Sequence, residues 1–291
     1  MKKYLRFKSS FIITIALICG TATAAPQPAH PRLGEHLHEL GIGASPNVIW
    51  IGTHGETAVS DDGGMHWHVI RALHGIDAME MSITPDGKMI VVAGHYGIRI
   101  SRDGGRTWTN ANRGLPSRDD HGFGFDLRNI HHMAAYVVGH GMYVSDDGGV
   151  RWTALGPLHL PPTVEMPMGD IYVRGNRIMI PVMMSGFALS TDGGKTWKVV
   201  GQEVSGMDLH TARSNPNMMF FSGMQQGLFI SKDGGKTWIH RVLPLGAEIT
   251  SGRVGGVMYA AGYDDGRPYL WKSSDTGRTW HAIAAPWPWK W

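Results

Sequence analysis

The chain has 291 residues, with 27 Lys or Arg, 24 Asp or Glu, 16 His and a single Cys. Four of the basic residues and none of the acidic ones lie in the first 25 residues, so the remainder holds 23 basic and 24 acidic residues and is close to neutral. A nearly neutral chain offers no basic footprint for nucleic acid, and a single cysteine, Cys19, excludes an internal disulfide framework.

The first 25 residues are typical of a secretory signal peptide. A basic start is followed by a short apolar run, Phe11 to Cys19, and then by the small-residue site Ala22-Thr23-Ala24. The run is shorter than the about 20 apolar residues that span a bilayer, so we expect cleavage and no transmembrane span. The sequence therefore predicts a periplasmic or secreted protein that begins near residue 26. The basic residues of this segment are Lys2, Lys3, Arg6 and Lys8.

One octapeptide recurs six times after this segment, at steps of 41, 44, 45, 41 and 42 residues. Such a period is the signature of a repeat architecture. The copies read SDDGGMHW from Ser60, SRDGGRTW from Ser101, SDDGGVRW from Ser145, STDGGKTW from Ser190, SKDGGKTW from Ser231 and SSDTGRTW from Ser273. Their aspartates are Asp62, Asp103, Asp147, Asp192, Asp233 and Asp275, and their tryptophans are Trp67, Trp108, Trp152, Trp197, Trp238 and Trp280.

The flanks of the octapeptide predict four strands in each unit. A short strand precedes each copy, an apolar run such as VIWIG or MIVVAG precedes that strand, and a further strand comes earlier still. The Trp is expected to begin the fourth strand. Radial repetition of four-stranded antiparallel sheets is a β-propeller, so the sequence predicts an all-β, six-bladed propeller over 26–291. Its blades are expected at about 34–73, 74–117, 118–160, 161–203, 204–245 and 246–285.

The octapeptide has a structural role in this prediction. Its glycines permit positive φ in a tight hairpin, and its Asp can accept backbone N–H bonds within the turn. Its Trp supplies a large apolar side chain that fills the space between blades.

These octapeptides and their spacing resemble the Asp-box, or BNR-repeat, propellers over roughly residues 34 to 285. That resemblance includes sialidases, xyloglucan-active glycosidases, sortilin-type receptors and photosystem II assembly factors, so it implies a fold and leaves the function open. A sialidase is disfavoured, because the Arg-Ile-Pro motif and the recurring arginines of the sialidase triad are absent.

A functional site is expected at the end of the propeller opposite the Asp boxes. The turns between the second and third strands lie there, and they carry His54, His95, His140, Met184 and Gln225. The innermost strands or their approaches add His36, His38, Asp77, Met79, Met81, Asp120, His121, Glu165, Met166, Met168, Met207, Asp208, His210 and Glu248. The leading hypothesis is an exported propeller that binds a small-molecule, glycan or protein ligand on this face, rather than an enzyme. The aromatic tail Trp287, Trp289 and Trp291 is a further contact surface, or it packs over the last blade.

The histidines and methionines of this face predict a metal, because imidazole and thioether together suit copper, and imidazole also suits zinc. The candidate ligands are His54, His95 and His140, with His36, His121, Met168, Met184 or Met207. This hypothesis requires His54, His95 and His140 to reach one ion. The alternative is that these histidines face solvent and the methionines are core residues.

The alternative function is a glycoside hydrolase, which needs two carboxyl groups about 5–9.5 Å apart. The candidates are Asp77, Asp120, Glu165, Asp208, Glu248 and Asp264. The sequence does not say which of them would face each other.

Overall fold

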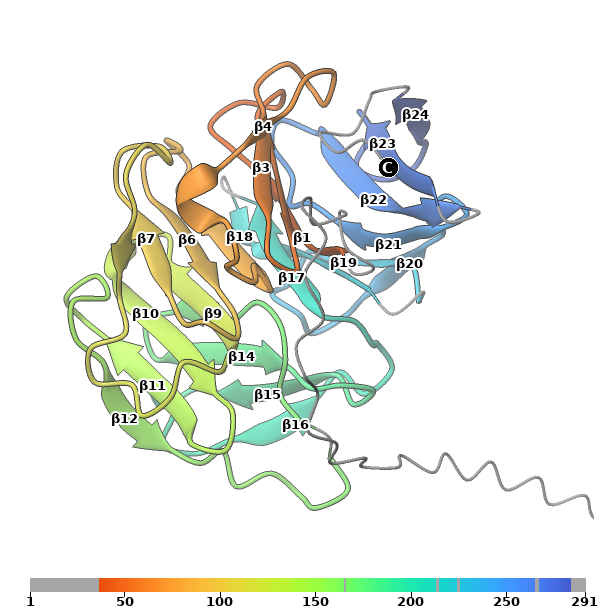
Figure 1. Ribbon diagram of the computed structural model, residues 1–291. Coiled ribbons are helices and arrows are strands. Elements are labelled where there is room, and N and C mark those ends of the chain that lie inside the picture. The colour runs from red at the N-terminus through yellow and green to blue at the C-terminus, as the bar shows by residue number, and fades with distance from the viewer. Residues whose placement is uncertain (1–36, 165, 213–214, 224–225, 265–266, 284–291) are drawn as a thin grey trace, which may run out of the picture. The chain divides into compact units, whose positions relative to one another are not determined.

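The computed structural model describes residues 37–164, 166–212, 215–223, 226–264 and 267–283. Six separate sheets each contain four consecutive strands in antiparallel order, which confirms the predicted six-bladed propeller. Figure 1 shows the six sheets, and strand β1 of the first blade lies beside β21 and β22 of the last. The strands are, blade by blade, β1 (Leu37–Ile42), β2 (Ile49–Thr53), β3 (Thr57–Ser60), β4 (His68–Val69); β5 (Glu80–Ile83), β6 (Ile90–Ala93), β7 (Arg99–Ser101), β8 (Thr109–Asn110); β9 (Asp120–Asp126), β10 (Asn129–Val137), β11 (Gly141–Ser145), β12 (Thr153–Gly156); β13 (Tyr172–Arg174), β14 (Arg177–Pro181), β15 (Phe187–Ser190), β16 (Lys198–Val200); β17 (Asp208–Ala212), β18 (Asn215–Ser222), β19 (Leu228–Ser231), β20 (Ile239–Arg241); β21 (Ala247–Thr250), β22 (Met258–Asp264), β23 (Arg267–Ser273), β24 (His281–Ile283).

Helix is almost absent: within the described ranges the single helical element is the 3-10 turn η1 (Arg71–Leu73). In the part of the chain that the structure describes, no helix is long and apolar enough to cross a membrane. The outermost strands begin just after the box tryptophans rather than at them, as β8 and β16 do after Trp108 and Trp197.

Each Asp box is a self-contained network of hydrogen bonds. In the second box, the Ser101 hydroxyl donates to Asp103 at 2.8 Å, and the Thr107 hydroxyl and backbone N–H donate to the same carboxylate at 2.6 and 2.9 Å. The Thr107 hydroxyl and these other donors lower the pKa of Asp103 to about 2. In the first box His66 stands where Thr is usual, and its Nδ1 contacts the Asp62 carboxylate at 2.6 Å. The imidazole therefore takes the place of the missing hydroxyl.

The boxes also define the two ends of the propeller. The first Gly of a box donates to the turn between the two inner strands of its own blade, as Gly63 does to Asn47 at 2.8 Å and Gly104 to Lys88 at 2.9 Å. The Asp boxes and these inner turns therefore share one end, called the box end below. The turns between the second and third strands lie at the opposite end, called the top face.

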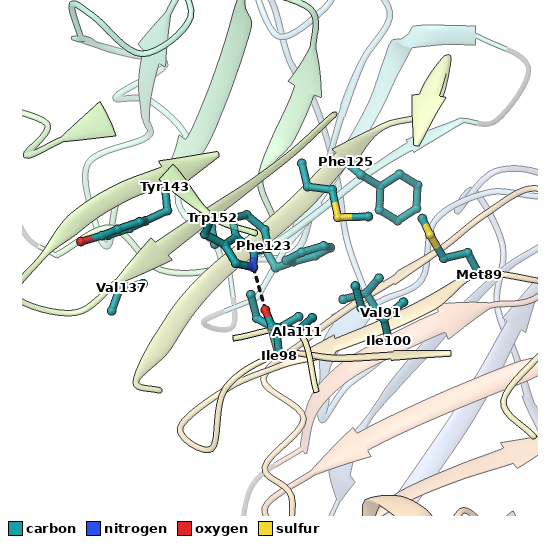
Figure 2. Close-up of a cluster of buried hydrophobic side chains, with 13 residues drawn as sticks. Met89, Val91, Ile98, Ile100, Ala111, Phe123, Phe125, Val137, Tyr143 and Trp152 are labelled. Atoms are coloured by element: carbon teal, nitrogen blue, oxygen red, sulfur yellow. Dashed lines mark hydrogen bonds between the residues drawn. The ribbon is translucent and has the colours of Figure 1, made fainter. Parts of the chain in front are cut away.

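The core lies between neighbouring blades. Figure 2 shows the contact of blades 2 and 3, where Val91 and Ile100 lie opposite Phe123 and Trp152. Trp152 is 2% exposed, and its indole N–H donates to the Ala111 carbonyl of blade 2 at 2.6 Å. This tryptophan therefore joins two blades by packing and by a hydrogen bond.

Candidate metal site at the top face

Two of the predicted turn histidines meet at one buried carboxylate. His54 follows β2, His95 follows β6, and Asp77 lies in the segment that enters β5. His54 Nδ1 lies 3.0 Å from Asp77 Oδ1, and His95 Nδ1 contacts Asp77 Oδ2. The two imidazole rings are stacked at 6.2 Å with an interplanar angle of 15°. Since Asp77 is 2% exposed, it orients both rings from the interior of the protein.

A second carboxylate lies on the other side of His95. His95 Nε2 is 3.8 Å from Asp119 Oδ1, and His121 Nε2 is 3.1 Å from the same oxygen. The His95 and His121 rings are 4.9 Å apart and nearly perpendicular. Asp119 and His121 flank the first residue of β9, so the inner strand of blade 3 brings both of them to the top face.

His38 of β1 adds a second histidine from blade 1 to the network. Its ring lies 4.2 Å from that of His54, edge to face, and its Nε2 is 3.7 Å from Asp77 Oδ1. Three consecutive blades thus supply one continuous group of side chains, called the histidine cluster below. Its members are His38, His54, Asp77, His95, Asp119 and His121.

The distances around Asp119 fit a metal ion. Two ligands bound at about 2.0–2.1 Å to a tetrahedral ion lie about 3.4 Å apart. The separations from Asp119 Oδ1 to His121 Nε2 and to His95 Nε2, 3.1 and 3.8 Å, bracket that value. All three ligand atoms lie within 4.8 Å of one another.

His121 is in the right state to bind a cation. It is 8% exposed, its Nδ1 has no hydrogen-bond partner within the described part of the chain, and its Nε2 contacts Asp119. Burial lowers the pKa of His121, although Asp119 opposes this shift, so the neutral ring that a metal requires is favoured. The side chains of His95 and Asp119 are 41% and 42% exposed, which leaves the site open to solvent on one side.

A second group of carboxylates surrounds the propeller axis. Each blade supplies one, at or near the start of its innermost strand, and we call them the channel carboxylates: Glu39, Glu80, Asp120, Asp170, Asp208 and Glu248. Burial raises the pKa of Glu39, Glu80, Asp120 and Asp208 well above the usual range, and that of Asp170 to about 8. Neighbouring carboxylates add to this effect at Glu39 and Glu80. The sequence interpretation missed Glu39, Glu80 and Asp170. The available signal was an acid followed directly by an apolar residue near the start of the innermost strand, a pattern that recurs along the chain.

His140 does not join the histidine cluster, contrary to the requirement that it share an ion with His54 and His95. It lines a separate cavity with Tyr136, Leu158 and His159. The expected third histidine is replaced by His121, which was a secondary candidate.

The candidate methionines have surroundings of their own. Met184 is 57% exposed and its sulfur accepts from the Ser205 hydroxyl at 3.9 Å, whereas Met81 is a core residue that is 3% exposed. Met168 and Met207 donate backbone N–H bonds to the strands beside them, at Pro181 and Ser222. The described part of the cluster is therefore defined by imidazole and carboxylate, not by thioether.

The candidate catalytic carboxyls are mostly inaccessible. Asp77, Asp120 and Asp208 are 2%, 0% and 3% exposed, and Glu248 is partly buried. Several predicted features lie outside the described residues, and they are the signal peptide, His36, Glu165, Gln225 and the aromatic tail.

Comparison with known families agrees with the architecture. The model of the BNR/Asp-box repeat family matches residues 188–199, within the fourth of the six boxes. The chain is a BNR-repeat β-propeller. A search of curated proteins finds no match to it.

Solved structures share the fold of this BNR propeller at low sequence identity. The structure described as YCF48 bound to D1 peptide is 16% identical with a TM-score of 0.51, over 87% of this chain and 82% of that one. The nidogen/laminin complex is 8% identical with a TM-score of 0.55, over 72% of this chain and 80% of that one. A GH74 enzyme of Niastella koreensis is 20% identical with a TM-score of 0.47, and the match covers 85% of this chain but only 36% of the enzyme. The BNR propeller thus spans about a third of that enzyme. The likenesses to YCF48 and to the nidogen/laminin complex support the fold alone.

Proposed function

We propose that this BNR propeller is an exported protein that binds a divalent transition-metal ion, copper or zinc, in the histidine cluster of its top face. The observation that carries the proposal is the arrangement of His95, Asp119 and His121, whose ligand atoms lie within 4.8 Å of one another. Behind them, Asp77 accepts from the far nitrogen of His95, which is the usual arrangement of a metal-bound imidazole and its carboxylate partner.

The donor set determines which metals are expected. Imidazole and carboxylate suit Zn²⁺ and Cu²⁺, whereas cuprous copper prefers sulfur ligands. The three primary ligands leave at least one coordination position for solvent, since His95 and Asp119 are each about 40% exposed. A bound ion would therefore present an open position to a small molecule or to a side chain of a partner protein.

Two observations weigh against the alternative of a glycoside hydrolase. That chemistry needs two carboxyls that reach a sugar, and the candidates Asp77, Asp120 and Asp208 are at most 3% exposed. Among the described residues, the accessible carboxylate of Asp119 has the histidines His95 and His121 as its neighbours.

Export is part of the proposal and is supported by the sequence of residues 1–25. A basic start, a short apolar run and a small-residue site are the three parts of a secretory signal. The only cysteine, Cys19, lies within this segment, so the cluster would work in an oxidising compartment without an exposed thiol.

The test is metal binding to the purified chain after removal of metals by a chelator. We expect Zn²⁺ and Cu²⁺ to bind the parent protein, and the double variant H95A/H121A to bind at least about 100-fold more weakly at this site. The Cu²⁺ electron paramagnetic resonance spectrum should show nitrogen hyperfine splitting in the parent and lose it in the double variant.

His140→Ala is the matched control, because His140 occupies a corresponding turn and lies outside the cluster. Its affinity and spectrum should equal those of the parent. Unchanged binding in H95A/H121A, with circular dichroism showing that the variant is folded, would refute the proposal.

A further inference from the structure

Side chains from three blades that are not all neighbours meet on the propeller axis. Glu39 lies on β1 of blade 1, Asp170 precedes β13 of blade 4, and His210 lies on β17 of blade 5. His210 Nε2 is 3.5 Å from Glu39 Oε1, and His210 Nδ1 is 3.9 Å from Asp170 Oδ2. These ligand atoms all lie within 4.8 Å of one another.

The polar atoms of this group are buried and have few hydrogen-bond partners. Glu39 and Asp170 are 1% and 5% exposed. Within the described residues, Glu39 Oε1 and His210 Nε2 have no hydrogen-bond partner outside this group. The Asp170 carboxyl interacts with Glu39 and with the Leu209 backbone. No Lys or Arg forms an ion pair with either carboxylate in the same part of the chain. Buried polar atoms without partners are costly, and a cation would serve all of them together.

We propose that Glu39, Asp170 and His210 form a second metal site, distinct from the histidine cluster, which takes a divalent ion such as Mn²⁺ and ties blades 1, 4 and 5 together. The ligand chemistry selects this class of ion. Carboxylates suit Mg²⁺, Ca²⁺ and Mn²⁺, whereas one imidazole favours a transition metal, and Mn²⁺ accepts both. Burial and then the negative charges of Asp170, Asp208 and Glu80 raise the pKa of Glu39, and a cation would relieve this repulsion.

The site has an access route from the box end. A cavity of about 210 Å³ is lined by Asp170 and His210 and continues along the inner strands to the inner turns. Three arginines, Arg128, Arg174 and Arg253, line the same cavity. Arg128 is engaged by Asp126 at 3.3 Å, and Arg174 donates to Asn217 at 3.2 Å. The ion therefore belongs at the carboxylate end of the cavity, not at its arginine end.

A bound ion would stabilise the ring by linking blades that are not neighbours. Sheets of a propeller pack mainly against the next sheet, whereas blades 1 and 4 lie three positions apart in a ring of six. An ion present at about 100 times its dissociation constant should raise the melting temperature by about 5–10 °C for a domain of this size.

The experiment uses the full chain carrying H95A/H121A, so that the ligands His95 and His121 proposed for the top face do not contribute. In this background we expect Mn²⁺ to raise the melting temperature and to lose its aqueous electron paramagnetic resonance signal with one ion bound per chain. Adding Glu39→Gln and Asp170→Asn should abolish both effects. These isosteric changes remove mutual repulsion, so the metal-free melting temperature should stay the same or rise.

The exposed Glu203→Gln serves as the control for loss of one negative charge and should leave the Mn²⁺ response intact. Ca²⁺, Mg²⁺ and Zn²⁺ are compared under the same conditions. Two results would overturn the proposal: no response to any of the four ions, or a response that survives Glu39→Gln with Asp170→Asn. A stronger response to Ca²⁺ or Zn²⁺ would overturn the assignment to manganese. The background removes His95 and His121 but keeps His38, His54 and Asp77, so a response is assigned to the axis only where Glu39→Gln with Asp170→Asn abolishes it. That criterion does not depend on the function proposed for the top face.

Discussion

Asp77→Asn changes one buried group that orients two histidines. The carboxylate accepts from His95 Nδ1 through one oxygen and lies 3.0 Å from His54 Nδ1 through the other. Asparagine has the same shape but a single acceptor oxygen, so one of the two imidazoles loses its acceptor. Loss of such a carboxylate partner weakens metal binding by about 10–100-fold, which corresponds to about 1.4–2.7 kcal/mol. We therefore expect D77N to bind Zn²⁺ about 10–100-fold more weakly than the parent protein.

The assay is competition with a chromophoric chelator at pH 7, with two comparison variants. Asp119→Asn removes a proposed ligand and should weaken binding more than D77N does. Asp146→Asn breaks another His–Asp pair, the 2.6 Å contact with His132, and should leave the affinity unchanged. Parental affinity in D77N, or a greater loss in D77N than in D119N, would refute the assigned roles.

Three further predictions concern the propeller itself. Gly75→Ala puts a Cβ at φ 74° where no atom lies within 4 Å, so it should lower the free energy of unfolding by about 1–2 kcal/mol through backbone strain alone. Gly105→Ala has a similar φ of 89° and also brings its Cβ 2.6 Å from the Trp50 ring, so urea unfolding should show a larger loss. Trp152→Phe leaves the carbonyl of the neighbouring blade without its donor and should cost about 1–3 kcal/mol by the same assay; no loss would contradict that bond. The pKa of Asp103 is lowered to about 2 in the folded state, so its contribution to stability is complete above about pH 4 and is lost as the pH falls toward 2. In D103N the urea midpoint should therefore fall less steeply between pH 5 and pH 2 than it does in the parent protein.

The six blades could be predicted because the Asp box is a local structure. Its Ser, Asp and second Gly bond to one another within four residues, as Ser101 does with Asp103 and with the Gly105 N–H at 2.8 Å. A motif stabilised within one turn keeps its Ser, Asp, second Gly and Trp in every copy, so counting the copies counts the sheets. The exact ends of the strands depend on partners in other strands, and the predicted start of the fourth strand at the Trp was one residue early.

The grouping of the turn histidines was predicted only in part, because side-chain direction depends on turn length. His54 and His95 lie six residues before the serine of their boxes, and the structure brings them together. His140 lies five residues before its serine. Side chains alternate faces along a strand, so a difference of one residue turns the side chain toward another surface. That spacing was visible in the sequence and could have separated His140 from the pair.

Strand β1 explains how one segment serves both proposed sites. Leu37 pairs with Thr53 and Glu39 pairs with Gly52, so His38 is the extra residue of a β-bulge. A bulge changes the direction of the side chain it carries, and here His38 contacts His54 while Glu39 reaches His210 on the axis. In a regular strand the side chains of residues 38 and 39 would point to opposite faces of the sheet, without the change of direction that the bulge adds. A single buried acid in an apolar strand gives no signal by itself. Glu39 is recognised as a channel carboxylate only when the inner strands of all six repeats are compared. The bulge therefore places an imidazole at the top face and a carboxylate on the axis from consecutive residues.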